Sequence, residues 1–342
     1  MYDHRQASGA VGGGAALSPR LESALRLQYS ECNPVRIPLI ARQKERFLMN
    51  TDSLTIPTKD GRELRISVVG QPDGIPILTH HGTPGSRLPN PLNVEDAQSR
   101  GIRLISYDRP GYGGSSPHQG RTVADAAEDV ASIARHLNLE RLAVWGVSGG
   151  GPHALACAAL LPELVVAAAA LASPAPYPTE GLDWFAGMGK DNIDEFGAAL
   201  DGKDALVPYI ETQVPGMLGA DPKTLVQALR SLLCPVDVAA LTEDFADFLL
   251  KSIREGIEHS RDGWVDDDTA FTTPWGFELS QIEIPVLLIH GEQDQMVPIS
   301  HGKWLASQIA HIDARLLPDD GHLTLSAYRI PEVHAWLLSK MS

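Results

Sequence analysis

The chain has 342 residues, enough for one large domain or for a domain that carries a substantial insertion. Its composition, with 43% hydrophobic and 21% charged residues, is typical of a globular protein with an ample core. The formal net charge is −15 and lysine and arginine are not clustered, which argues against nucleic acid and against an anionic membrane as partners.

The first fifty residues differ in pattern from the rest of the chain. Residues 1–20, which include a run of three glycines, have the composition of a flexible leader. Residues 21–52 are amphipathic and predict a helical extension. Such an extension offers a surface that packs either on the main domain or on a second copy of the chain.

From residue 53 onward the pattern predicts alternating strands and helices. A hairpin is expected over residues 54–69, with its turn at Asp60-Gly61. Further apolar strands are predicted at residues 75–79, 102–107, 142–147, 165–171, 284–289 and 314–317. Because apolar strands that alternate with helices form a mostly parallel sheet covered on both faces, we predict an α/β fold. Its core comprises residues 53–175 and 276–342.

Between the two parts of this core, residues 176–275 interrupt the alternation and are helical in character. We predict a helical cap that covers the carboxyl ends of the strands, where open α/β sheets bind ligands. The aromatic residues of the cap are candidates for the wall of a substrate pocket: Trp184, Phe185, Trp264 and Trp275.

The stretch Gly146-Val147-Ser148-Gly149-Gly150 fits the pattern G-x-S-x-G, between an apolar strand and a helix of small residues. Such a turn holds a serine in a strained backbone conformation with its hydroxyl exposed. Glycines flank it because a side chain there would collide with the neighbouring strand or helix. Ser148 is therefore the candidate nucleophile.

A serine hydroxyl needs a base that is itself oriented by a carboxylate. The loops after the last two predicted strands supply both groups, Asp294 in one loop and His322 in the next. Among the other histidines, His290 ends a buried strand, whereas His301 and His311 lie on or beside a helix and are expected to be solvated.

Four loops agree in type and order with the α/β-hydrolase fold family, which the chain resembles. They are His81-Gly82-Thr83-Pro84, the loop from Asp108 to Ser115, the serine turn, and the Gly-x-x-Asp and Gly-His pair. The resemblance covers about residues 53–342 and is closest to the capped branch of proline iminopeptidases, epoxide hydrolases, haloalkane dehalogenases and small esterases. Enzymes of that branch that act on epoxides or haloalkanes carry an aspartate at the nucleophile position, and Ser148 argues against both.

The resemblance also implies an oxyanion hole formed by the backbone N–H groups of Thr83 and Gly149. Two amide donors aimed at a developing alkoxide stabilise it by roughly 3–4 kcal/mol each. By the same resemblance, His81 supports its loop. The adjacent residues His80 and His81 point to opposite faces of a strand, so they are poorly placed to share a metal ion.

These residues predict a serine hydrolase that cleaves a small ester, thioester or lactone through an acyl-enzyme on Ser148. Two other reactions remain open, carbon–carbon bond hydrolysis and an aminopeptidase activity like that of proline iminopeptidases. The latter needs a cap carboxylate for the substrate ammonium; the candidates are Glu180, Glu195, Glu211 and Glu243. A catalytically silent ligand-binding homologue would be marked by loss of a triad member, and none is lost.

The remaining expectations concern cofactors, partners and location. No metal, nucleotide or flavin site is visible, so we expect no cofactor and a small-molecule substrate as the partner. The cysteines Cys32, Cys157 and Cys234 are widely spaced, which suits a reducing compartment. With no signal-peptide core and no apolar run near the roughly 18 residues of a membrane helix, a cytoplasmic protein is expected. A homodimer through the N-terminal extension or the cap is a further hypothesis.

Overall fold

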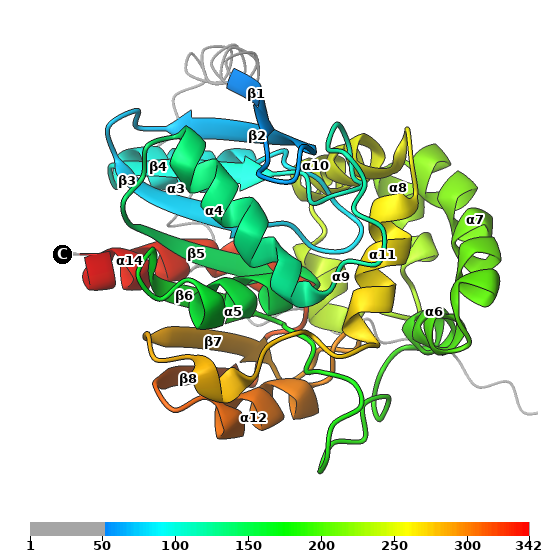
Figure 1. The fold of residues 1–342 in the computed structure, drawn as a ribbon. Coiled ribbons are helices and arrows are strands. Elements are labelled where there is room, and N and C mark those ends of the chain that lie inside the picture. The colour runs from blue at the N-terminus through cyan, green and yellow to red at the C-terminus, as the bar shows by residue number, and fades with distance from the viewer. Residues whose placement is uncertain (1–51, 342) are drawn as a thin grey trace, which may run out of the picture. The chain divides into compact units, whose positions relative to one another are not determined.

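The computed structural model describes residues 52–341, and its central feature is an eight-stranded sheet (Figure 1). The predicted leader, residues 1–20, and all but the last residue of the predicted extension, residues 21–52, lie outside this range. The strand order is β1-β2-β4-β3-β5-β6-β7-β8. The strands are β1 (Asp52–Pro57), β2 (Glu63–Gly70), β3 (Ile75–His80), β4 (Ile102–Tyr107), β5 (Leu142–Val147), β6 (Val165–Leu171), β7 (Val286–Gly291) and β8 (Ile312–Leu317).

The predicted N-terminal hairpin is present as the antiparallel pair β1 and β2, and β2 is antiparallel to β4. From β4 to β8 every neighbouring pair is parallel. The central strands are buried almost throughout, which explains their uninterrupted apolar sequences, such as VVAAAAL in β6. The prediction of a mostly parallel α/β sheet is confirmed.

Helices cover both faces of the sheet and form two hydrophobic cores. One core contains residues of α4 (Ala126–His136), α5 (Gly150–Leu160) and α12 (Ile299–Gln308). The other contains residues of α3 (Pro91–Ser99) and α14 (Ile330–Met341). The short elements η1 (Val123–Asp125), η2 (Leu279–Gln281) and α13 (Leu323–Tyr328) complete this part of the chain.

Six α-helices lie between β6 and β7 in the described chain, and together we call them the helical insertion. They are α6 (Lys190–Leu200), α7 (Lys203–Gly219), α8 (Pro222–Ala228), α9 (Pro235–Ala240), α10 (Glu243–Ile257) and α11 (Asp262–Phe271). The insertion gathers beside one end of the strands in Figure 1 and has apolar clusters of its own. Tyr112, which follows β4, packs into one of these clusters and so joins the insertion to the sheet.

Local sequence explains the longest amphipathic helix of the insertion, α10. Thr242 accepts a hydrogen bond from the backbone N–H of Phe245, and Glu243 adds negative charge to the first turn. Its buried residues recur at helical spacing: Phe245, Ala246, Leu250 and Ile257. The helix therefore lays one apolar stripe against its neighbours and keeps charges on the other side.

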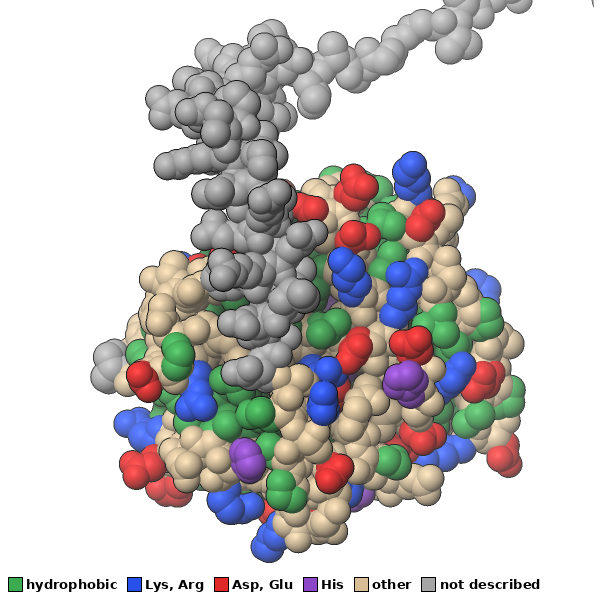
Figure 2. All heavy atoms as spheres, turned by 90° about the horizontal axis from the view of Figure 1, so that it is seen from above, with side chains coloured by type: hydrophobic (Ala, Val, Ile, Leu, Met, Phe, Trp, Pro, Cys, Tyr) green, Lys and Arg blue, Asp and Glu red, His purple; other side chains and the backbone are tan. Residues whose placement is uncertain are grey.

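The molecular surface mixes both signs of charge. Figure 2 shows acidic and basic side chains interspersed over one face of the molecule, with no continuous basic area on that face. Within residues 52–341, no helix combines the length and the apolar character that crossing a membrane requires.

Candidate active site

The turn between β5 and α5 holds Ser148 in the left-handed backbone region, with φ of 53°. Such a conformation is strained for a residue with a side chain and is tolerated where the surroundings enforce it. The surroundings here are closely packed backbone: a Cβ on Gly146 would lie 2.1 Å from the carbonyl oxygen of Gly150, and one on Gly150 would lie 2.2 Å from that of His80. Glycine at both positions thus allows the turn that presents Ser148.

The loops after β7 and β8 bring Asp294 and His322 together. Nδ1 of His322 lies 2.8 Å from Oδ2 of Asp294, and both residues are buried. The other carboxylate oxygen of Asp294 accepts the backbone N–H groups of Met296 and Val297, each at 2.8 Å. The carboxylate is therefore fixed by its own loop, and it orients the imidazole so that Nε2 is left for other partners.

The electrostatic surroundings of His322 favour its charged form. Burial, the largest influence, lowers the pKa of this imidazole, but the charge of Asp294, its hydrogen bond and the charge of Asp237 outweigh it and raise the pKa above the usual value. His290 is fully buried beside Asp294, and burial lowers its pKa. Of these two imidazoles, His322 is the one suited to accept a proton.

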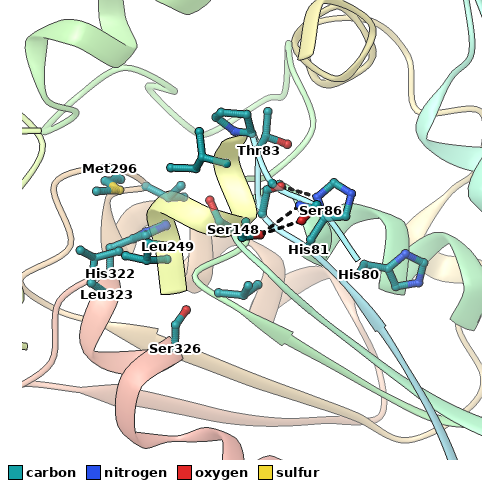
Figure 3. Close-up of a pocket in the computed structure, with 18 of the residues that line it drawn as sticks. His80, His81, Thr83, Ser86, Ser148, Leu249, Met296, His322, Leu323 and Ser326 are labelled. Atoms are coloured by element: carbon teal, nitrogen blue, oxygen red, sulfur yellow. Dashed lines mark hydrogen bonds between the residues drawn. The ribbon is translucent and has the colours of Figure 1, made fainter. Parts of the chain in front are cut away.

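Ser148 and His322 line the same cavity, of about 250 Å³, between the sheet and the helical insertion (Figure 3). Most of its wall is apolar and comes from the insertion and neighbouring loops: Met188, Met217, Leu229, Leu232, Phe248, Leu249, Ile253, Met296 and Leu323. A small molecule with an alkyl or acyl chain fits such a wall.

The loop after β3 lies against the serine turn. A Cβ on Gly82 would be 3.7 Å from the Cβ of Ser148, and a Cβ on Gly149 would be 2.2 Å from Oγ1 of Thr83. The two residues expected to donate backbone N–H groups, Thr83 and Gly149, are therefore in direct contact beside the serine. His81 stabilises this loop, since Nδ1 bonds the carbonyl oxygen of Gly82 at 2.7 Å and Nε2 accepts the backbone N–H of Arg109 at 3.2 Å.

A buried carboxylate from the insertion, Asp267 of α11, holds the same loop from the other side. It accepts hydrogen bonds from the hydroxyl groups of Thr83 at 2.7 Å and Tyr112 at 2.9 Å. Arg109 and Arg121 form ion pairs with it, each at 2.6 Å. Burial would raise the pKa of Asp267, but the two guanidinium charges hold that pKa well below its usual value.

Next to it, Asp268 and Glu195 form a carboxyl pair in the cavity wall. Burial raises the pKa of both groups, and for Asp268 the charge of Glu195 adds to the effect, so the pKa of Asp268 lies well above its usual value. Nε1 of Trp264 donates to Glu195 at 2.7 Å. These two neighbouring carboxyl groups therefore disfavour a further negative charge beside them.

The structure separates the four aromatic residues expected at the pocket. Trp184 and Trp264 line the cavity, whereas Phe185 and Trp275 are not among its lining residues. Trp275 is buried in the core that contains α4 and α5. Phe185 packs against Trp184 with ring centroids 5.2 Å apart. Phe185 and Trp275 therefore contribute to packing rather than to the cavity wall.

The expectation that His301 is solvated is wrong. Its side chain is fully buried, with Nδ1 accepting the backbone N–H of Ala175 at 3.1 Å and Nε2 bonded to the carbonyl oxygen of Trp184 at 2.8 Å. The ring thus satisfies two backbone groups in the segment that leads into the insertion. His311 is exposed, as expected.

The buried acids of the insertion, Asp237, Asp267 and Asp268, were not predicted from the sequence. The signal for two of them was present as three consecutive aspartates in one helix, beside Trp264 and Val265. A helix with such a run beside apolar residues must bury some of its aspartates, and a buried aspartate needs a cationic partner or a proton. Arg109 and Arg121 were the cations available for this role.

The eight-stranded sheet and the tight turn that holds Ser148 after β5 define an α/β-hydrolase architecture. The chain belongs to the alpha/beta hydrolase fold family, whose model matches residues 75–326, from β3 into α13. It is 27% identical over 274 residues to the AB hydrolase superfamily protein YisY of Bacillus subtilis, covering 78% of this chain and 91% of that protein.

Two further similarities come from proteins with a stated activity. The bifunctional esterase/perhydrolase DCH of Acinetobacter calcoaceticus is 26% identical over 255 residues, which cover 71% of this chain and 83% of the relative. The solved structure of a thermophilic esterase from Thermogutta terrifontis superposes with a TM-score of 0.63 at 20% identity, over 85% of this chain and 100% of the esterase. The structural likeness shows the shared fold.

Proposed function

We propose that the protein is a serine hydrolase that cleaves a small ester-type substrate and needs no cofactor. The observation that carries the proposal is the 2.8 Å contact between Asp294 and His322, because His322 lines the same cavity as Ser148. The esterase activity in the name of the Acinetobacter relative supports the same class of reaction.

The reaction begins when Oγ of Ser148 attacks the acyl carbon and His322 takes the hydroxyl proton. Asp294 holds the imidazole and stabilises its charged form. The oxygen of the tetrahedral intermediate is stabilised by the backbone N–H groups of Thr83 and Gly149. His322 then returns the proton to the leaving alcohol, and water releases the acyl group from Ser148 by the same sequence of proton transfers.

The cavity wall favours an uncharged acyl chain. Twelve of its lining residues are leucine, methionine or phenylalanine, and the wall also contains the carboxyl pair Glu195 and Asp268. A carboxylate on the substrate would meet these two carboxyl groups in a buried setting, where like charges repel strongly. We therefore expect a neutral aliphatic or aromatic ester rather than a dicarboxylic acid derivative.

The test is hydrolysis of p-nitrophenyl esters from acetate to octanoate, with proline p-nitroanilide beside them. Wild type is compared with Ser148→Ala and with the control Ser307→Ala, which removes an exposed hydroxyl on α12 outside the cavity. Ester turnover that is lost only in Ser148→Ala supports the proposal. Turnover that survives in Ser148→Ala contradicts the mechanism, and turnover of the anilide alone would favour an aminopeptidase.

Covalent labelling gives an independent answer that does not require the natural substrate. A fluorophosphonate probe reacts with an activated serine, and peptide mass spectrometry locates the label. We expect modification of Ser148 in wild type and in Ser307→Ala, and none in Ser148→Ala. A label on any other residue would refute the assignment of the nucleophile.

A further inference from the structure

Besides Asp267, the helical insertion has a second buried carboxylate at the site, which lies next to the candidate base. Asp237 of α9 is fully buried and accepts three backbone N–H groups from the loop that carries His322. Oδ2 accepts from His322 at 3.0 Å, and Oδ1 accepts from Leu323 at 2.7 Å and from Thr324 at 3.1 Å. These N–H groups open helix α13, so a residue 85 positions earlier in the chain caps that helix.

The surroundings of Asp237 fit its carboxylate closely. The thiol of Cys234 donates to Oδ2 at 3.2 Å, which gives the carboxylate four donors in a buried position. A Cβ on Gly321 would lie 2.5 Å from each oxygen of the carboxylate, so a side chain at this position would displace Asp237. The Gly-His sequence at residues 321 and 322 is thereby explained by contact with the insertion.

Asp237 also acts on the imidazole through its charge. Charged or titratable groups that face His322 come from three elements: Asp294 after β7, His290 in β7 and Asp237 in α9. Burial lowers the pKa of His322, and the charges of both aspartates raise it. Asp237 accepts a hydrogen bond from the backbone of His322, whereas Asp294 bonds its ring.

We propose that Asp237 is a positioning residue for the catalytic base. It fixes the backbone of His322 from the insertion and supplies a second negative charge that stabilises the imidazolium formed during the reaction. The position of His322 then depends on the packing of α9, so the insertion contributes to turnover as well as to the substrate pocket. This inference rests on the proposed hydrolase function.

The first test compares wild type with Asp237→Asn and with Asp247→Asn, a control that removes one charge from an exposed site on α10 of the same insertion. The pKa of His322 is measured by NMR of carbon-labelled imidazoles, with His322→Gln identifying the signal. The rate of fluorophosphonate labelling of Ser148 is measured across pH on the same samples. Near-UV circular dichroism verifies the fold of each variant.

In Asp237→Asn we expect the pKa of His322 to fall and labelling at its pH plateau to slow roughly tenfold or more, as misplacement of a catalytic group does. The acidic limb of the labelling profile moves to lower pH together with the pKa. Asp247→Asn is expected to match wild type in both measurements. Unchanged pKa and labelling in Asp237→Asn overturn the inference, and so does slower labelling with an unchanged pKa, which marks a purely structural role.

A second variant tests the contact from the other side if Asp237→Asn does not fold. Gly321→Ala pushes a methyl group toward the carboxylate, and we expect labelling to slow in the wild-type background. Combining Gly321→Ala with Asp237→Ala removes the collision. The labelling rate of the double variant is therefore expected to fall by less than the product of the two single decreases. Multiplicative losses would overturn the inference.

The two proposals fail in different ways. If wild type shows neither turnover nor labelling, the hydrolase function falls, and the NMR pKa of His322 in Asp237→Asn still decides whether Asp237 acts on the imidazole. If wild type is reactive and Asp237→Asn equals it in both measurements, only the role of Asp237 falls.

Discussion

Thr83 donates its hydroxyl hydrogen bond to Asp267 across 2.7 Å, joining two residues 184 positions apart. Thr83 lies in the loop that touches the serine turn, and Asp267 lies in the last helix of the insertion. Arg109 donates to both of them, at 3.0 Å to Thr83 and 2.6 Å to Asp267. The loop that contains the proposed oxyanion donor is thus held by a charged group of the insertion.

Replacement of Thr83 tests this connection without removing a backbone N–H. Thr83→Val deletes the hydroxyl at nearly constant volume, and Thr83→Ser keeps it. We expect kcat to fall about tenfold or more in Thr83→Val, with a smaller change in KM, because a displaced oxyanion donor weakens transition-state binding. Thr83→Ser should retain most of the activity, and equal losses in both variants would speak against the connection.

Asp267 is expected to contribute strongly to stability because it neutralises buried arginines. Asp267→Asn leaves Arg109 and Arg121 without their carboxylate, and losing one partner of a buried pair costs about 3–5 kcal/mol. Urea denaturation at neutral pH measures the loss. Asp204→Asn, at the exposed start of α7, serves as the control and should unfold like wild type.

The lowered pKa of Asp267 also predicts how stability depends on pH. A carboxyl group with a folded-state pKa below its unfolded value stabilises the protein above the unfolded pKa, about 3.9, and loses that contribution as the pH falls toward the folded pKa. The difference in unfolding free energy between wild type and Asp267→Asn should therefore shrink below about pH 4. A difference that stays constant through this range would contradict the charge assignment.

The raised pKa of His322 predicts the pH profile of catalysis. Since the neutral imidazole takes the serine proton, kcat/KM should rise with pH along an acidic limb whose midpoint lies above the usual histidine value of about 6.5. Asp294→Asn removes both the charge and the correct orientation, so we expect the limb to move to lower pH and kcat to fall by about 10⁴-fold, by analogy with other triads. An acidic limb below the ordinary imidazole range in wild type would contradict this electrostatic picture.

The Glu195–Asp268 pair predicts selectivity against acidic substrates. Glu195→Gln removes one of the two ionisable carboxyl groups, so the ratio of kcat/KM for a half-ester of adipic acid to that for a hexanoate ester of the same alcohol should rise by about tenfold. Glu258→Gln, at the exposed end of α10, is the matched control. If the ratio stays the same in Glu195→Gln, the pair does not sense the substrate.

The sequence allowed the sheet and the positions around the serine to be predicted for a physical reason. Parallel strands buried on both faces leave continuous apolar runs, and the tight turn after β5 requires glycines at Gly146 and Gly150, so both leave local patterns. Asp294 and His322 follow such strands, and the carboxyl ends of parallel strands meet at one edge. Their contact could therefore be anticipated from strand order.

The acids of the insertion could not be predicted in the same way. Asp237 and Asp267 act through contacts that depend on how α9 and α11 pack on loops far away in the chain, and no local pattern records that packing. His301 shows the same limit: its ring bonds two backbone groups of the segment that leads into the insertion, and no local pattern in the sequence records that contact. Trp275 likewise joined the core rather than the pocket.

The close packing around Gly146 and Gly150 determines which positions near Ser148 can tolerate substitution. Any side chain at Gly146 or Gly150 would overlap backbone atoms, so random mutagenesis should recover almost no active variants there. Most of the leucines and methionines of the pocket wall lie outside the strands of the sheet, and volume-conserving exchanges among them should be tolerated. A directed-evolution library aimed at new substrates should therefore be confined to residues such as Leu229, Leu232 and Leu249, leaving the reaction chemistry untouched while the preferred acyl chain is changed.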